Sequence, residues 1–312
     1  MLRILLLCVL LAFQPGFALA QNWPERPVRI IVPFAAGGGT DAIARVMAKK
    51  FSDALGQQFF VENRPGASGL VGTQAAAKAD PDGYTLLIGD ANIASNRNLD
   101  ALADLTPVTQ LAWTPLVLAA HPSLQCTTLA ELLQLAQTRP VDYSTPGIGS
   151  PHHLTGEYIN KVQSTKLTHV PYRGAGPAVT DAVGGQVNLT ISGMPPVVPF
   201  LQSGGLKAIA VTSKRRSPTF ADIPSMAETK GFEEFDITNW YGLFARSAVS
   251  SIVLERLQKA SAEALKDPQV RQIFTTQAAE PVGSTRSEFG DFFRGEVDKY
   301  SKLAGSIELK NQ

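Results

Sequence analysis

The sequence predicts an α/β protein of two lobes, each with a doubly wound parallel sheet, joined by two crossing strands. Strand and helix patterns alternate from residue 28 to about 88, and again from about 128 to 211. One extended apolar run, 108–120, separates the two series, and an aromatic one, 235–245, follows them. Alternation of this kind is typical of parallel sheets covered by helices on both faces. A length of 312 residues favours two such units.

The first lobe is expected to cover residues 21–115. Residues 28–32 form an apolar strand, and 40–55 form a helix whose apolar side chains recur at helical spacing. A strand at 59–61, a helix at 70–79 and a strand at 84–88 complete the series. The run 108–120 then crosses from the first lobe to the second.

The second lobe is expected to cover residues 116–238. Thr128 and Glu131 form a capping box that begins a helix. The expected elements that follow are strand 141–144, helix 151–160, strand 169–171, helix 177–183 and strands 189–192 and 208–211. The run 235–245 returns the chain, and residues 239–312 complete the first lobe with helices that begin near residues 251, 268 and 285.

The first twenty residues predict a secretory signal peptide. Arg3 supplies the positive charge, 4–13 is an apolar run, and Ala18-Leu19-Ala20 is a cleavage pattern. The run is shorter than the roughly 20 apolar residues of a membrane helix, and no later stretch approaches that length. We therefore expect a periplasmic protein that does not insert into the membrane.

The charge and cysteine counts exclude several classes of function. The chain has 28 Lys and Arg and 27 Asp and Glu, and removal of Arg3 leaves 27 of each. A balanced surface without basic clusters argues against nucleic acid as a partner. Cys126 is the only cysteine left after cleavage, so neither an intrachain disulfide nor a cysteine-based metal site can form. We expect a monomer without cofactor or metal.

A glycine-rich turn, PFAAGGGTD at 33–41, links the first strand to the first helix. Its three glycines allow the backbone to approach a ligand closely. The N-terminus of a helix exposes unpaired N–H groups and the positive end of the helix dipole, which suit an anion. In open α/β sheets, ligands bind at this carboxyl end of the strands.

A matching turn, STPGIGSPHH at 144–153, precedes a helix of the second lobe, with Ser150 as N-cap and a proline at the first helical position. Two such turns can bracket one carboxylate across a cleft. The turns 64–69 and 172–177 are expected to line it too, and Arg173 either pairs with the ligand or is solvated. His153 and Glu157 have helical spacing but no third metal ligand, and no activated nucleophile is evident. We therefore expect a binding protein and not an enzyme.

One enzymatic alternative remains open. Gly37, Gly39 and Ala42 fit a loose dinucleotide fingerprint, and Glu62 stands where a ribose-binding acid would lie. The turn is longer than usual, however, and Asp41 puts a negative charge beside the expected pyrophosphate. An oxidoreductase is thus the weaker interpretation.

Seven segments of the chain resemble one known family in sequence and order. They are 23–34, 37–41, 61–69, 82–87, 147–154, 170–174 and 240–243. The chain resembles the Bug family, the extracytoplasmic solute-binding receptors of tripartite tricarboxylate transporters. The resemblance implies a two-lobed periplasmic-binding-protein fold of type II-like topology, without enzymatic activity. It also implies capture of a small carboxylate (a di- or tricarboxylate, a carboxylated amino acid or an aromatic acid) and delivery to membrane transporter subunits.

The resemblance also implies ligand-binding residues, by position in the family's two turns. These are Phe34, Gly38, Gly39, Thr40 and Asp41 in the first lobe, and Thr145, Gly149, Ser150 and His153 in the second. We add Ser68 and Tyr172 from the two further turns. The chain departs from the family pattern at 90–98, so the identity of the ligand stays open. An exported sensory subunit for a membrane kinase would bind the same ligands and is an alternative.

The signal peptide gives a direct prediction. Protein recovered from the periplasm should begin at Gln21, which leaves 292 of the 312 residues, and intact-mass measurement checks this. Retention of residues 1–20 would contradict the expected export.

Overall fold

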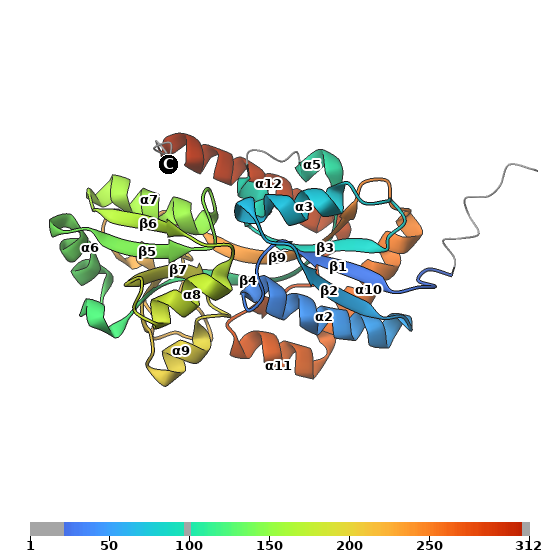
Figure 1. Cartoon of the computed structure of the whole chain (residues 1–312), viewed down its shortest axis with the longest axis horizontal. Coiled ribbons are helices and arrows are strands. Elements are labelled where there is room, and N and C mark those ends of the chain that lie inside the picture. The colour runs from blue at the N-terminus through green and yellow to red at the C-terminus, as the bar shows by residue number, and fades with distance from the viewer. Residues whose placement is uncertain (1–21, 97–100, 308–312) are drawn as a thin grey trace, which may run out of the picture.

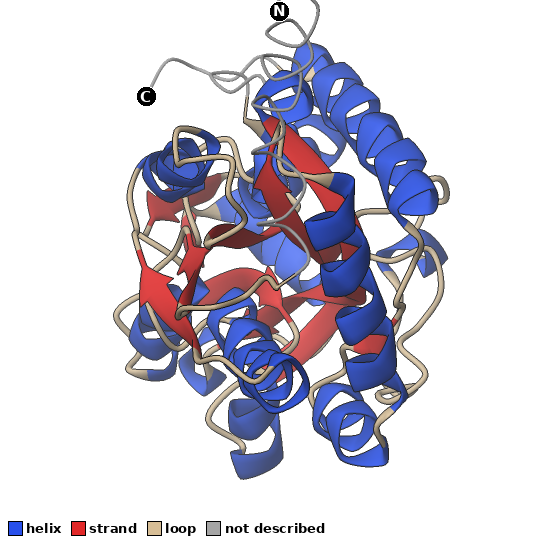
Figure 2. Cartoon of the chain, turned by 90° about the vertical axis from the view of Figure 1, so that its right-hand side faces the viewer, coloured by secondary structure: helices blue, strands red, loops and turns tan. Residues whose placement is uncertain are grey.

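The computed structural model describes residues 22–96 and 101–307, so the expected signal peptide lies outside the described residues. Two α/β lobes lie side by side along the longest axis, and helix α12 (Arg286–Ser306) runs along both of them (Figure 1). Helices cover both faces of the strands (Figure 2). The predicted fold class is confirmed.

Lobe one is built around three parallel strands. Strand β1 (Val28–Val32) lies between β2 (Phe59–Asn63) and β3 (Thr85–Asp90). Helices α2 (Gly39–Leu55) and α3 (Leu70–Ala77) connect them. Helix α2 buries one face, including Met47 and Phe51, and its other face is polar, as the periodicity of the sequence predicted. The carboxyl ends of β1 and β3 therefore reach the same edge of the sheet.

Lobe two repeats this arrangement. Strand β5 (Val141–Thr145) pairs in parallel with β6 (Leu167–Pro171) and with β7 (Leu189–Gly193). The other elements are α6 (Leu129–Thr138), α7 (Pro151–Gln163), α8 (Ala175–Val183), α9 (Val198–Ser203) and β8 (Lys207–Val211). The capping box of Thr128 and Glu131 is formed as expected at the start of α6.

Two segments join the lobes. Strand β4 (Leu105–Ala120) pairs with β9 (Thr238–Arg246) as far as Pro115, and with β7 and β8 from Leu116 onward. The returning chain donates a hydrogen bond from Ile237 N–H to the Thr212 carbonyl, at 3.1 Å, before it enters β9. The expected lobe boundaries at 115 and 238 stay predictions, which these changes of partner support.

The C-terminal helices α10 (Ser251–Lys266), α11 (Pro268–Thr276) and α12 follow β9. Helix α12 is fixed to β9 by two bonds: Trp240 Nε1 donates to Glu296 at 2.9 Å, and the Tyr300 hydroxyl donates to the Thr238 carbonyl at 3.2 Å. The short elements α4 (Asn92–Ser95), α5 (Ala101–Asp104), α9 and β10 (Glu280–Pro281) were not predicted. Among the described residues, no helix combines the length and hydropathy needed to cross a membrane.

Candidate functional site

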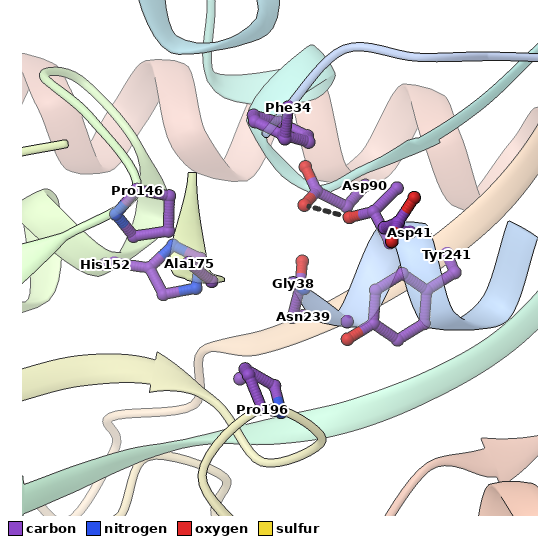
Figure 3. A pocket seen from close by; sticks show the side chains of 13 residues that line it. Phe34, Gly38, Asp41, Asp90, Pro146, His152, Ala175, Pro196, Asn239 and Tyr241 are labelled. Atoms are coloured by element: carbon purple, nitrogen blue, oxygen red, sulfur yellow. Dashed lines mark hydrogen bonds between the residues drawn. The ribbon is translucent and has the colours of Figure 1, made fainter. Parts of the chain in front are cut away.

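A cavity of about 20 Å³ lies where the two lobes meet (Figure 3). Lobe one lines it with Phe34, Gly38, Gly39, Thr40, Asp41, Asp90, Asn239 and Tyr241, and lobe two with Pro146, His152, Ala175, Gly193 and Pro196. Such a volume holds about one or two water molecules. A ligand of several carbons can therefore enter only if the lobes move apart.

The turn before α2 presents backbone to this cavity. Gly37 has a φ of 86°, in the left-handed region that favours glycine, whereas Gly38, the N-cap, is extended with a φ of −84°. A Cβ atom at Gly39 would overlap the Tyr241 hydroxyl, so only glycine fits there. No side chain caps the helix. The first N–H groups of α2 are thus available at the edge of the cavity.

The turn before α8 approaches from lobe two. Ala35 N–H donates to the Arg173 carbonyl at 3.0 Å, and a Cβ atom at Gly38 would lie 3.6 Å from that of Ala175. A Cβ atom at Gly176 would lie 2.6 Å from the carbonyl oxygen of Ala36, closer than packing allows. No side chain caps α8 at Gly174. Two helix N-termini, each the positive end of a dipole, therefore meet at one cavity.

The carboxylate of Asp41 forms hydrogen bonds with protein groups in and around the glycine-rich turn. It accepts hydrogen bonds from Gly37 N–H at 3.1 Å, from Asn63 Nδ2 at 3.0 Å and from Arg45 Nε at 3.0 Å. Burial raises the pKa of Asp41, but the bonds from Arg45, Gly37 and Asn63 outweigh burial and leave that pKa below its usual value. Asp41 therefore fixes the glycine turn, and Arg45 neutralises its charge.

A second acid, Asp90, ends β3 at the cavity. Its Oδ2 accepts from the Thr40 hydroxyl at 2.9 Å, and its Oδ1 accepts from the backbone N–H and the amide of Asn92, at 3.0 and 2.7 Å. Burial raises the pKa of Asp90 to about 6, against these hydrogen bonds and one from Asn239, which lower it.

His152 and Tyr241 bring polar groups to opposite sides of the cavity (Figure 3). Burial lowers the pKa of His152 to about 3, so its ring is neutral, and its Nδ1 has no hydrogen-bond partner among the described residues. Burial, and then the charge of Asp90, raise the pKa of Tyr241 above its usual value. Both side chains are therefore neutral, and each can form a hydrogen bond with a ligand in that state.

Four of the lobe-two residues named from the sequence bond to protein and do not line this cavity. Ser150 caps α7 at His153 N–H. His153 Nδ1 accepts from Gly149 N–H, and the ring stacks on His169 at 4.0 Å. Thr145 Oγ1 lies 2.6 Å from His169 Nε2, and the Tyr172 hydroxyl donates to Asp181 at 2.6 Å. Their expected contacts with a ligand stay predictions.

Ser68 and Gly149 line a second cavity, of about 300 Å³, next to the first. Asn92 lines it as well and bonds to Asp90 of the first cavity, so the two adjoin. Ser68 Oγ donates to the Ile148 carbonyl at 2.6 Å, which closes the lobes at this point. Arg173 is exposed and contributes its backbone carbonyl to lobe contact.

The sequence did not single out Asp90, Asn239 or Tyr241, and it singled out His153 where His152 lines the cavity. Ala175 lies in the turn 172–177, which was expected to line the cleft. A charged residue directly after the apolar strand 84–88 is the signal that could have identified Asp90. Glu62, the expected ribose-binding acid, is bound instead by Arg29, at 3.1 Å, and by Arg64. The described residues hold no group of side chains suited to a metal.

Comparison with known proteins finds one family throughout the chain. Residues 43–309 match the model of the tripartite tricarboxylate transporter family receptor. Protein BugT of Bordetella pertussis is 35% identical over 93% of this chain and 92% of its own length. A protein of R. palustris solved with adipate is 31% identical, with a TM-score of 0.87 over 91% of this chain and 97% of its own. MatC from Rhodopseudomonas palustris, solved with malate, is 29% identical, with a TM-score of 0.83 over 90% of this chain and 99% of its own.

The pKa of Asp90 predicts a pH-dependent stability. Because its folded pKa, about 6, lies above the ordinary 3.8, the folded protein binds more protons there than the unfolded one. The free energy of unfolding therefore falls as the pH rises from about 3.8 to about 6. Asp90→Asn should unfold at a higher temperature than the wild type, with a gain that grows between about pH 5 and pH 7.5 to at most about 3 kcal/mol. Thermal unfolding at both pH values checks this, and a gain independent of pH would contradict it.

Proposed function

Because this chain belongs to the tripartite tricarboxylate transporter receptors, the Bug family, we propose that it captures a small carboxylate between its lobes and delivers it to a membrane transporter. The family and its solved members are periplasmic binding receptors and not enzymes. The dinucleotide oxidoreductase weighed from the sequence is thereby dismissed.

The observation that carries this proposal is the meeting of the α2 and α8 N-termini at one cavity. Each helix offers uncapped N–H groups, and each adds the positive end of its dipole. A carboxylate placed between them accepts charge-assisted hydrogen bonds from both lobes at once. The ligand then holds the lobes together, as in other receptors that close around their ligands.

Two similar structures support a carboxylate ligand, since one was solved with adipate and the other with malate. We propose that Phe34, Gly38, Gly39 and Thr40 contact the ligand from lobe one. Ala175 and His152 contact it from lobe two. Ser150 and His153 hold the second turn in shape, and Ser68 and Gly149 lie beside the part of the ligand that reaches the second cavity.

The first test is a screen of mono-, di- and tricarboxylates by thermal shift, followed by calorimetric titration. A ligand that binds only the folded protein raises its unfolding temperature, by about 2.7 kcal/mol of stability at a hundredfold excess over Kd. We expect at least one small carboxylate to do so and to reduce the radius of gyration in small-angle scattering. If no carboxylate stabilises the protein, the proposal is wrong.

The second test blocks closure without touching the ligand. Gly176→Ala places a methyl group against the Ala36 carbonyl oxygen, where only 2.6 Å is available. Overpacking of this kind costs about 1–3 kcal/mol, which weakens binding by about 5- to 150-fold. Calorimetric titration measures the loss, and scattering should show less contraction than in the wild type.

The matched control is Gly295→Ala, on α12, where a Cβ atom meets nothing within 4 Å. Both substitutions favour the helix by about 0.5–1 kcal/mol, so neither should lower the unfolding temperature of the free protein by disrupting its helix. Wild-type affinity in a folded Gly176→Ala protein would show that binding does not need this approach of the lobes.

A further inference from the structure

Asp90 differs from the other buried acids around the lobe contact. Arg45 lies 3.0 Å from Asp41, and Lys299 pairs with Glu296. Asp90 takes part in none of the ion pairs found within residues 22–96 and 101–307, although it is buried and lines the cavity. A buried charge without a partner is costly, and such charges are normally paired.

The groups bonded to Asp90 favour its ionised form. The Thr40 hydroxyl, the backbone N–H and amide of Asn92, and the Asn239 amide all donate to its oxygens. The bonds from Thr40 and Asn92 fill three of the roughly four acceptor sites of the carboxylate, two on Oδ1 and one on Oδ2, so a donor from the ligand would share the fourth site, on Oδ2, with the Asn239 amide. With a pKa of about 6, the carboxyl is mostly ionised at neutral pH.

The titratable groups that face Asp90 provide no positive charge. Burial raises the pKa values of Tyr241 and Tyr300, which are therefore neutral, and burial keeps His152 neutral above about pH 3. Asp41, on α2, is itself an anion bound to Arg45. Since none of these groups supplies a cation, a positively charged group on a bound ligand would be the one to pair with Asp90.

The cavity thus has two electrostatically different ends. The α2 and α8 N-termini favour an anion, and Asp90 favours a cation or a strong N–H donor. We propose that the ligand is an amino carboxylate, whose carboxylate lies at the two helix N-termini and whose protonated amine bonds to Asp90 Oδ2. This inference rests on the proposed function, and it makes Asp90 the residue that determines specificity.

The test compares ligands that differ only by an amino group. The pairs are L-aspartate and succinate, L-glutamate and glutarate, and L-alanine and propionate, each titrated by calorimetry at neutral pH. We expect the amino member of at least one pair to bind the wild type at least about tenfold more tightly, because it alone pairs with the buried carboxylate.

Asp90→Asn keeps the shape and most of the hydrogen bonds, since its oxygen can accept from Asn92 and its amide can donate to the Thr40 hydroxyl. It should lose the preference for the amino member by about ten- to a hundredfold while plain carboxylates bind as well or better. Asp142→Asn, on an exposed position of β5, removes the same charge elsewhere and should leave the preference unchanged. Circular dichroism confirms the fold of both variants.

The pH dependence separates Asp90 as a charge partner from Asp90 as a proton donor. The affinity for L-aspartate, whose own groups do not titrate between about pH 5 and pH 7.5, should fall by about tenfold as Asp90 becomes protonated toward pH 5. An affinity that rises toward acid pH would mean that protonated Asp90 donates to a plain carboxylate, and would overturn the inference.

The outcomes also separate this inference from the proposed function. If the wild type binds succinate, glutarate or propionate as tightly as the amino members, the amino carboxylate is excluded and the carboxylate receptor stands. The inference is equally overturned if Asp90→Asn keeps the wild-type preference. If none of the six compounds binds and the wider carboxylate screen also fails, both proposals are wrong; if only these six fail, the amino carboxylate alone is excluded.

Discussion

The ligand cavity depends on the close approach of two backbone turns, one before α2 and one before α8. There is no room for a side chain at Gly176, because the Ala36 carbonyl oxygen lies in its way, and Ala35 bonds to the carbonyl of Arg173. Only backbones this close can direct two helix N-termini at the same small space. In the proposed binding mode, closure and capture of an anion are one event, since the anion offsets the repulsion between two like dipole ends.

The two connections between the lobes lie where the strand pairing changes from one lobe to the other. Strand β4 belongs to the pairing of lobe one as far as Pro115 and to that of lobe two from Leu116, so an opening of the lobes would bend the chain where its partners change. The chain that returns to β9 lies beside this point, because Ile237 N–H donates to the Thr212 carbonyl and Thr212 N–H donates to the Leu116 carbonyl. Helix α12 lies against β9 and also contacts α7 of lobe two, which limits the directions in which the lobes can separate.

Local patterns allowed most of the fold to be predicted, but the site was predicted only in part. Helix α2 and the capping box at Thr128 depend on residues close in sequence, and they form as expected. Asp90 and Tyr241 face each other only because β3 and β9 pair antiparallel, in a register that single-sequence periodicity does not reveal. His152 and His153 are adjacent, and which of them lines the cavity depends on the Gly149 bond and on stacking with His169.

Two acids of similar burial have opposite consequences for ligand choice. The carboxylate of Asp41 is satisfied by Gly37, Asn63 and Arg45, so it holds the anion site together without repelling the anion. Backbone N–H groups alone bind one carboxylate much like another, and discrimination requires a buried side chain that the wrong ligand leaves unpaired. Asp90 is such a side chain. Its hydrogen-bond donors are all neutral. A ligand without a positive group would therefore leave the buried charge of Asp90 uncompensated, and the free-energy cost of that charge would select against such a ligand.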